Sequence, residues 1–205
     1  MREPNTQQPL TQAPITQPSI KQGMTSVTTD VKTQPGGAYS AAFGHIDPAA
    51  PDYDEIRRVC TTLVPFGNHA GVRVTEIGPE RAVVEVPDAE HLTNHMGTVH
   101  AGALFLAADI AGAAAFLGAA ATRLHTIRRF VLRDSRTAFR KPAIGRIRAI
   151  GLIDERAIRE VLAAEGELRM DVDGKALMYD DADVLVAKAT FDYVVDVATG
   201  ADQER

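Results

Sequence analysis

The feature that most restricts how this chain can fold is the segment from Ala101 to Thr122. It carries one charged residue, Asp109, among residues that are almost all Ala, Gly, Leu, Ile and Phe. Its apolar residues recur at three- and four-residue spacing, which predicts one helix of about five to six turns. Because most of the side chains are small, other elements can approach this helix closely on several sides. We therefore expect it to be the central helix of a small α+β domain.

The same segment is close to the length of a membrane span, which needs about 20 mainly apolar residues. An Asp near the centre of a span costs roughly 2.5 to 3.5 kcal/mol on insertion scales, and Ala and Gly offset little of that cost. We therefore expect a buried helix and no membrane span. A carboxylate in such a helix is expected to have a function, because burying it unpaired is costly.

The start of the predicted helix holds small and polar residues, namely Asn94, Gly97, His100, Ala101 and Gly102. Thr98 is a suitable N-cap residue, so the first free backbone N–H groups are expected at positions 101 and 102. Amides at a helix start bind negative charge. Asp109 lies seven residues beyond Gly102, close to two turns, so it shares their helix face at roughly 10 Å along the axis.

The string N-x-x-G-x-x-H-x-G, followed by an Asp nine residues after the His, resembles the hotdog-fold acyl-CoA thioesterases of the phenylacetic-acid-degradation type. The resemblance covers about residues 55–195 and implies an antiparallel sheet wrapped around a long central helix. The residues that match the family motif are Asn94, Gly97, His100, Gly102 as the second glycine of His-Gly-Gly, and Asp109 as the catalytic acid, while Ala101 replaces the first glycine.

The resemblance also implies roles for these residues. Asp109 would activate water or attack the thioester, and an apolar setting would raise its basicity. The amides of Ala101 and Gly102 would form an oxyanion hole, and Asn94 would orient the water or the carbonyl. His100 fits a hydrogen-bonding role at the helix start better than that of a general base. Because hotdog sites form between two subunits, a homodimer or a dimer of dimers is implied.

A basic run lies between Arg123 and Arg148, where nine Lys or Arg residues accompany one acid, Asp134. The run carries a local charge of +8 in a chain of net charge −5. It is either a solvated strand face or a site for the phosphates of coenzyme A. Arg140 and Lys141 are the best-placed cations, because the matching turn lies near the nucleotide in the resembling family. Nucleic acid is not expected as a partner, because aromatic residues are few in the run and the chain is acidic.

The order of predicted elements follows that of the resembling family. We expect a helix before Pro65, a hairpin turning at Gly78, and strands at about 127–139, 144–153 and 167–195, the last interrupted near 180–183. A short helix capped by Asp154 and ended by Gly166 separates the later strands. Such an inserted helix also resembles one branch of hotdog proteins whose function is poorly assigned. Which strand residue completes the site, among residues 132–135, stays open.

The ends of the chain differ in composition from its middle. Residues 1–46 are rich in Gln, Thr and Pro and predict a disordered tail, residues 47–197 the hotdog domain, and residues 198–205 a flexible C-terminal tail. Deleting residues 1–38 is expected to leave the melting temperature unchanged. No secretory signal is expected, because an apolar h-region is lacking. The lone Cys60 excludes an intramolecular disulfide and fits a reducing, cytoplasmic location.

Two functions from different classes remain open. The first is hydrolysis of acyl-CoA thioesters, with coenzyme A as part of the substrate and no separate cofactor or metal. The alternative is a hotdog dimer that binds acyl-CoA or a fatty acyl group without catalysis. A hotdog hydratase is a weaker third, because its usual Asp and His pair is not found near the helix start. The acyl group is not indicated by the sequence.

Overall fold

A computed structural model describes residues 37–198. Most of the two tails predicted at residues 1–46 and 198–205, namely residues 1–36 and 199–205, lies outside the described residues. The helices are α1 Gly37–Phe43, α2 Tyr53–Leu63, α3 Pro65–Ala70, α4 Ala101–Ala119 and α5 Glu155–Ala163, with 3₁₀ helices η1 Glu90–Leu92 and η2 Ala121–Thr126. The strands are β1 Arg73–Ile77, β2 Ala82–Val86, β3 Ile127–Phe139, β4 Ile147–Ile153, β5 Leu168–Tyr179 and β6 Leu185–Val197.

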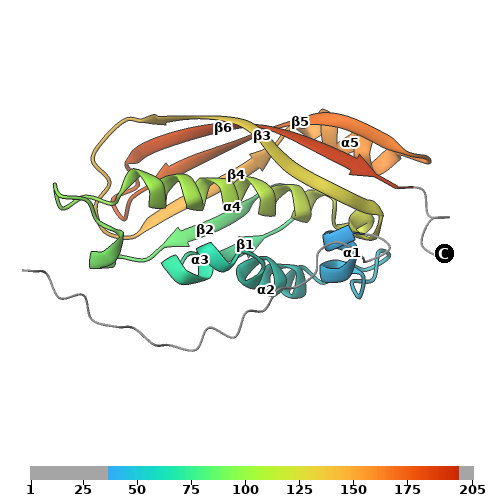
Figure 1. Ribbon diagram of the computed structural model, residues 1–205, viewed down its shortest axis with the longest axis horizontal. Coiled ribbons are helices and arrows are strands. Elements are labelled where there is room, and N and C mark those ends of the chain that lie inside the picture. Colours follow the sequence, from blue (N-terminus) through green and yellow to red (C-terminus); the bar gives the residue numbers. More distant parts are fainter. Residues whose placement is uncertain (1–36, 199–205) are drawn as a thin grey trace, which may run out of the picture. The chain divides into compact units, whose positions relative to one another are not determined.

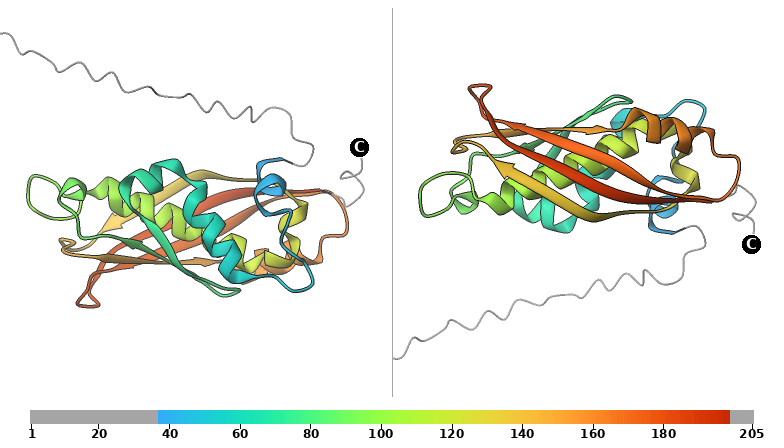
Figure 2. Two further views of the ribbon diagram at one scale, coloured as in Figure 1. Left: turned by 90° about the horizontal axis from the view of Figure 1, so that it is seen from below. Right: turned by 90° about the horizontal axis from the view of Figure 1, so that it is seen from above.

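The strands form one antiparallel sheet in the order β1-β2-β4-β5-β6-β3, and this sheet curves around α4. Figure 1 shows α4 running lengthwise through the fold, with β1 and β2 on one side and β5, β6 and β3 on the other. Helices α2 and α3 cross one side of α4, and β5 and β6 cover the opposite side (Figure 2). The predicted α+β hotdog architecture is therefore confirmed.

Helix α4 is the core helix of this fold. It is long and apolar enough to cross a membrane, but 13 of its 19 residues are buried inside the protein. Small residues let it approach the sheet. A Cβ atom at Gly151 on β4 would overlap the carbonyl oxygen of Ala111, and one at Gly118 would overlap that of Gly78. The backbones of helix and strand thus touch where the sequence places glycine.

Helix α1 begins the described fold, ten residues before the domain start predicted at residue 47. Its Phe43 is fully buried, Ile46 after it is also buried, and the Tyr39 hydroxyl donates a hydrogen bond of 3.1 Å to the carbonyl oxygen of Phe130 on β3. The boundary predicted at residue 47 is therefore wrong. Few apolar residues mark this helix in the sequence, and its stability comes from tertiary contacts.

The other predicted elements are mostly confirmed. The bounds of β3 match the prediction, and Asp154 caps α5 by accepting a hydrogen bond of 2.9 Å from the backbone N–H of Ala157. Three boundaries differ: α4 ends at Ala119, α5 ends at Ala163 well before Gly166, and β4 starts at Ile147.

The predicted C-terminal tail also starts one residue too early. Ala198 is buried, and its backbone N–H donates a hydrogen bond of 2.8 Å to the carbonyl oxygen of Thr126. Ala198 therefore belongs to the fold.

Candidate functional site

One stripe of α4 is left uncovered by the rest of the described chain. Over residues 101–113, the positions that are not buried are Ala101, Gly102, Phe105, Asp109 and Ala113. The spacing of four residues between 101, 105, 109 and 113 places them on one face of the helix. Asp109 therefore lies in the middle of an otherwise neutral stripe that runs to the N-terminus of α4.

Asp109 is a half-buried carboxylate that makes no hydrogen bond and no ion pair with the described residues. Burial raises its pKa above the ordinary value for aspartate. The charge of Asp109 affects two tyrosines. Desolvation, with smaller contributions from Cys60 and Asp109, raises the pKa of Tyr39 to about 12. Desolvation first, and the charge of Asp109 second, raise the pKa of Tyr193. A carboxylate with few hydrogen-bond donors and a raised pKa is a stronger base than a solvated one.

The N-terminus of α4 is capped by a histidine. His100 is the N-cap residue, and its Nδ1 accepts a hydrogen bond of 2.9 Å from the backbone N–H of Gly102. The prediction of Thr98 as N-cap is wrong, and the helix-start role predicted for His100 is confirmed. Gly102 is thus not a free oxyanion donor in this structure. Ala101, which is exposed, keeps an N–H that makes no hydrogen bond with the described residues.

The loop before α4 is built around Asn94. Its Oδ1 accepts hydrogen bonds from the backbone N–H of Met96, at 2.9 Å, and of Thr98, at 3.3 Å, while its Nδ2 donates to Thr98 Oγ1 at 2.9 Å. Gly97 adopts a φ of +70°, which favours glycine. The side chain of Asn94 is therefore committed to shaping the loop that presents the helix start.

The predicted site residues are not all brought together within one chain. Ala101 and Asp109 are eight residues apart, roughly 12 Å along the helix axis. A single thioester carbonyl cannot contact both groups of the same helix. Asn94, Gly97 and the helix start form one cluster, and Asp109 forms a second group further along the same stripe.

The basic run divides into paired and unpaired cations. Those bonded within the chain are Arg123 to the carbonyl of Ala164, Arg128 to Glu167, Arg129 to Asp196, Arg133 to Asp171 and Asp192, Arg146 to Asp181, and Arg148 to Asp183. Arg136, Arg140 and Lys141 are exposed, and no ion pair holds them among residues 37–198. The predicted pair, Arg140 and Lys141, is therefore available for an anionic ligand.

With this geometry in place, comparison with known proteins identifies the family. The sequence model of the DUF4442 family, described as a domain of unknown function, matches residues 54–195. This chain belongs to the DUF4442 family. No curated protein matches its sequence.

Solved structures show the fold of this DUF4442 chain. PA5026 from Pseudomonas aeruginosa, described as a protein of unknown function and probable thioesterase, is 24% identical with a TM-score of 0.60, over 75% of this chain and 99% of that one. The thioesterase HI1161 from Haemophilus influenzae is 12% identical with a TM-score of 0.55, over 71% and 91% of the two chains. The predicted resemblance to hotdog thioesterases is thereby confirmed at the level of the fold.

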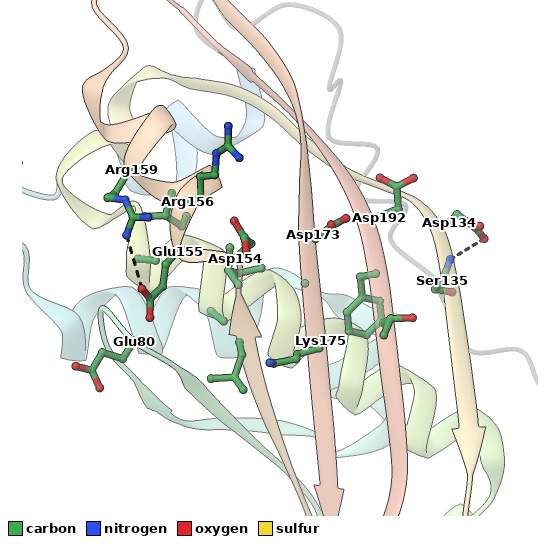
Figure 3. Close-up of a pocket in the computed structure, with 18 of the residues that line it drawn as sticks. Glu80, Asp134, Ser135, Asp154, Glu155, Arg156, Arg159, Asp173, Lys175 and Asp192 are labelled. Carbon is green, nitrogen blue, oxygen red and sulfur yellow. Dashed lines mark hydrogen bonds and ion pairs between the residues drawn. The ribbon is translucent and has the colours of Figure 1, made fainter.

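A large cavity of the DUF4442 chain lies away from Asp109. It has a volume of about 1300 Å³ and is lined by α5, the β1–β2 turn, the C-terminal half of α4, the end of β4 and the middle of β3, β5 and β6. Figure 3 shows that its charged groups come from several elements, among them Lys175 of β5, and that Glu155 and Arg159 pair within α5. Asp154 is held as the cap of α5, and Asp134 accepts from the N–H of Ser135. The cavity is lined by Asp134 and Ser135, two of the strand residues left open in the sequence analysis, but not by Asp109 or by the start of α4, so we keep the candidate site at Asp109.

One feature of this DUF4442 site, Tyr193, was missed by the sequence analysis. Tyr193 on β6 faces Asp109, and its strand neighbour in register on β3 is Leu132. Tyr193 is buried on β6, and no local pattern in the sequence locates its hydroxyl. Within residues 37–198, no group of three or more His, Cys, Asp or Glu side chains is placed to bind a metal.

Proposed function

We propose that this protein hydrolyses acyl-CoA thioesters to a free acid and coenzyme A. The observation that carries the proposal is Asp109, an unpaired carboxylate with a raised pKa on the uncovered stripe of the core helix. The hotdog fold shared with thioesterases of known structure supports it. Release of free thiol from acyl-CoA esters tests it.

We further propose that the site is completed by a second copy of the chain. Strand β3 pairs only with β6 among the described residues, so its other edge is open for pairing. Val131 and Phe139 on β3 are 43% and 53% exposed, and contact with a second chain would bury this apolar surface. Two such chains would bring Asp109 of one subunit near Ala101 of the other, and so remove the separation of roughly 12 Å along one helix.

The proposed reaction uses two groups of the protein, the carboxylate of Asp109 and the backbone N–H of Ala101. Asp109 takes a proton from water, and the resulting hydroxide attacks the thioester carbonyl carbon. The backbone N–H of Ala101, aided by the dipole of α4, stabilises the negative charge on the carbonyl oxygen. When the C–S bond breaks, the proton on Asp109 passes to the thiolate of coenzyme A. We propose no cofactor and no metal for these steps.

The pH dependence follows from the raised pKa of Asp109. Because general base catalysis needs the ionised carboxylate, kcat/KM is expected to rise with pH through the pKa of Asp109 in the free enzyme. Burial shifts that pKa upward, so the acid limb should have its midpoint above about pH 4. Steady-state rates measured between about pH 4 and pH 8 check this expectation. A rate independent of pH throughout this range would speak against Asp109 as the base.

The phosphates of coenzyme A are proposed to bind Arg140 and Lys141. Replacing both with Ala is expected to raise KM for acyl-CoA roughly tenfold, because two charge-assisted contacts are lost. The phosphates lie far from the reacting carbonyl, so kcat should change much less. The wild-type KM should also rise with added salt, and that of the double variant less steeply.

Two controls accompany the measurement. Replacing Arg146 and Arg148 with Ala removes the same charge, but these arginines are paired with Asp181 and Asp183, so KM should stay near the wild-type value. An acyl thioester without the nucleotide should be hydrolysed alike by every variant. If the Arg140 and Lys141 variant keeps the wild-type KM at low salt, the phosphates bind elsewhere.

A further inference from the structure

Tyr193 carries a buried hydroxyl that has no hydrogen-bond partner among the described residues. Its side chain is 1% exposed, and its ring is fixed by stacking on Phe130, with ring centroids 4.5 Å apart, and by Phe191, at 5.5 Å. Buried polar groups in folded proteins almost always have a partner, because leaving one unpaired is costly. A hydroxyl held in this way therefore indicates a partner that is not part of the chain.

The hydroxyl of Tyr193 lies against α4 at Gly112, one helix turn from Asp109. A Cβ atom at Gly112 would overlap it, so glycine at this position makes room for the hydroxyl. Gly112 follows Asp109 by three residues, and Cβ positions at this spacing on a helix are about 5–6 Å apart. A water molecule bonded to both groups would give the hydroxyl the hydrogen-bond partner that it lacks. A water needs two or more polar partners in such a place, and these two groups supply them.

On the basis of the thioesterase function proposed above, we propose that Tyr193 is a water-positioning residue, whose hydroxyl and the carboxylate of Asp109 together hold the water that attacks the thioester. The Tyr193 O–H donates to the water oxygen, and Asp109 accepts one of the water's protons. The remaining lone pair of the oxygen then points to the carbonyl carbon. In the reaction this O–H bond of the water breaks, its proton moves to Asp109, and a C–O bond forms.

The other ionisable groups that face Asp109 do not compete for this role. Tyr39 of α1 is committed, because its hydroxyl donates to the carbonyl oxygen of Phe130. Cys60 of α2 is a buried thiol whose pKa is raised by burial to about 12. Its electrostatic interaction is with Tyr39, whose pKa it raises. Burial also keeps Tyr193 protonated by raising its pKa, so it remains a donor. Among the described residues facing Asp109, Tyr193 is thus the donor that is still unused.

The test is Tyr193→Phe, which removes only the hydroxyl. We expect kcat on an acyl-CoA ester to fall about tenfold or more, with KM changed less than about twofold, because the lost contact acts on the attacking water and not on substrate binding. The melting temperature should not fall, since the hydroxyl makes no hydrogen bond within the described chain. Tyr179→Phe, the same change on β5 away from Asp109, should leave kcat unchanged.

A second measurement does not depend on activity. In a carboxyl ¹³C NMR titration, Tyr193→Phe should raise the pKa of Asp109 by about half a unit or more, because a donor acting through water favours the ionised carboxylate. If wild type hydrolyses no acyl-CoA but this shift is present, the proposed function fails and the water site between Tyr193 and Asp109 stands. If wild type hydrolyses acyl-CoA while neither kcat nor the pKa of Asp109 responds to Tyr193→Phe, the role of Tyr193 is overturned.

Discussion

Replacing Asp109 with Asn is expected to lower kcat for the best acyl-CoA substrate by at least about 100-fold, because the amide cannot accept a proton from water or act as a nucleophile. Asn has nearly the same shape as Asp, so the packing of the stripe on α4 is kept. The effect should appear in kcat rather than in KM, because the carboxylate acts on the attacking water. Unchanged turnover would remove Asp109 from the mechanism.

The stability of the Asp109→Asn variant provides the control for folding. Burial raises the pKa of Asp109 above its value in the unfolded chain, so the folded state holds this proton more tightly. As pH rises from the pKa of Asp109 in the unfolded chain to its pKa in the folded protein, the unfolded chain releases the proton first. The stability of the wild type therefore falls over this pH range. The Asn variant has no such proton. It should match the wild type below about pH 4 and melt at the same or a higher temperature near about pH 7.

Gly151→Ala is expected to have the largest effect on stability. The added methyl group would overlap the carbonyl oxygen of Ala111 and crowd the backbone N of Gly112, at 2.9 Å from its Cβ. Backbone atoms cannot rotate away as a flexible side chain can, so α4 must move off the sheet. Overpacking of a core costs about 1–3 kcal/mol, and the upper end applies here. For a chain of this size that lowers the melting temperature by about 6–12 °C, which a thermal denaturation curve measures.

Gly166→Ala is the matched control for this prediction. A Cβ atom at Gly166 meets no atom within 4 Å, so the same methyl group should change stability by about 0.5 kcal/mol or less. If the melting temperature of Gly151→Ala equals those of Gly166→Ala and the wild type, α4 and β4 do not touch as closely as described. Movement of α4 would also displace Asp109, so the folded Gly151→Ala protein should have a lower kcat than the wild type.

The fold was largely predictable because its signals are local. The single charge in residues 101–122 marked the core helix, and the bounds expected for the strand after it match those of β3. The capping side chain of Asp154 located α5. Helix α1 was not predictable from local signals, because Phe43 is buried only through the contacts of α1 with distant β3 and η2. The start of β4 was predicted too early because Gly145, at a φ of +71°, and the bond between Ala143 and Val99 hold the preceding segment as a loop.

Asp109 could be singled out from the sequence, whereas the hydrogen bonds around the start of α4 could not. Asp109 stood out by its surroundings, and the structure leaves it without a partner among the described residues, as a base would require. Thr98 and His100 are both able to cap a helix, and the choice depends on Asn94, which bonds to the Thr98 hydroxyl. That choice removes Gly102 from the predicted pair of oxyanion donors. The hydroxyl of Tyr193 is about 80 residues from Asp109 in sequence, so only the folded chain brings them together.

The measurement that tests the central claim most directly is thiol release from a panel of acyl-CoA esters by the full-length protein. The panel should range from short straight chains to long and aromatic acyl groups, with the Asp109→Asn variant assayed beside the wild type. We expect the wild type to release coenzyme A from at least one ester well above the spontaneous rate, and Asp109→Asn to lose this activity. If every ester is bound but none is hydrolysed by the wild type, the protein is an acyl-CoA binding dimer, and the proposed thioesterase function is contradicted.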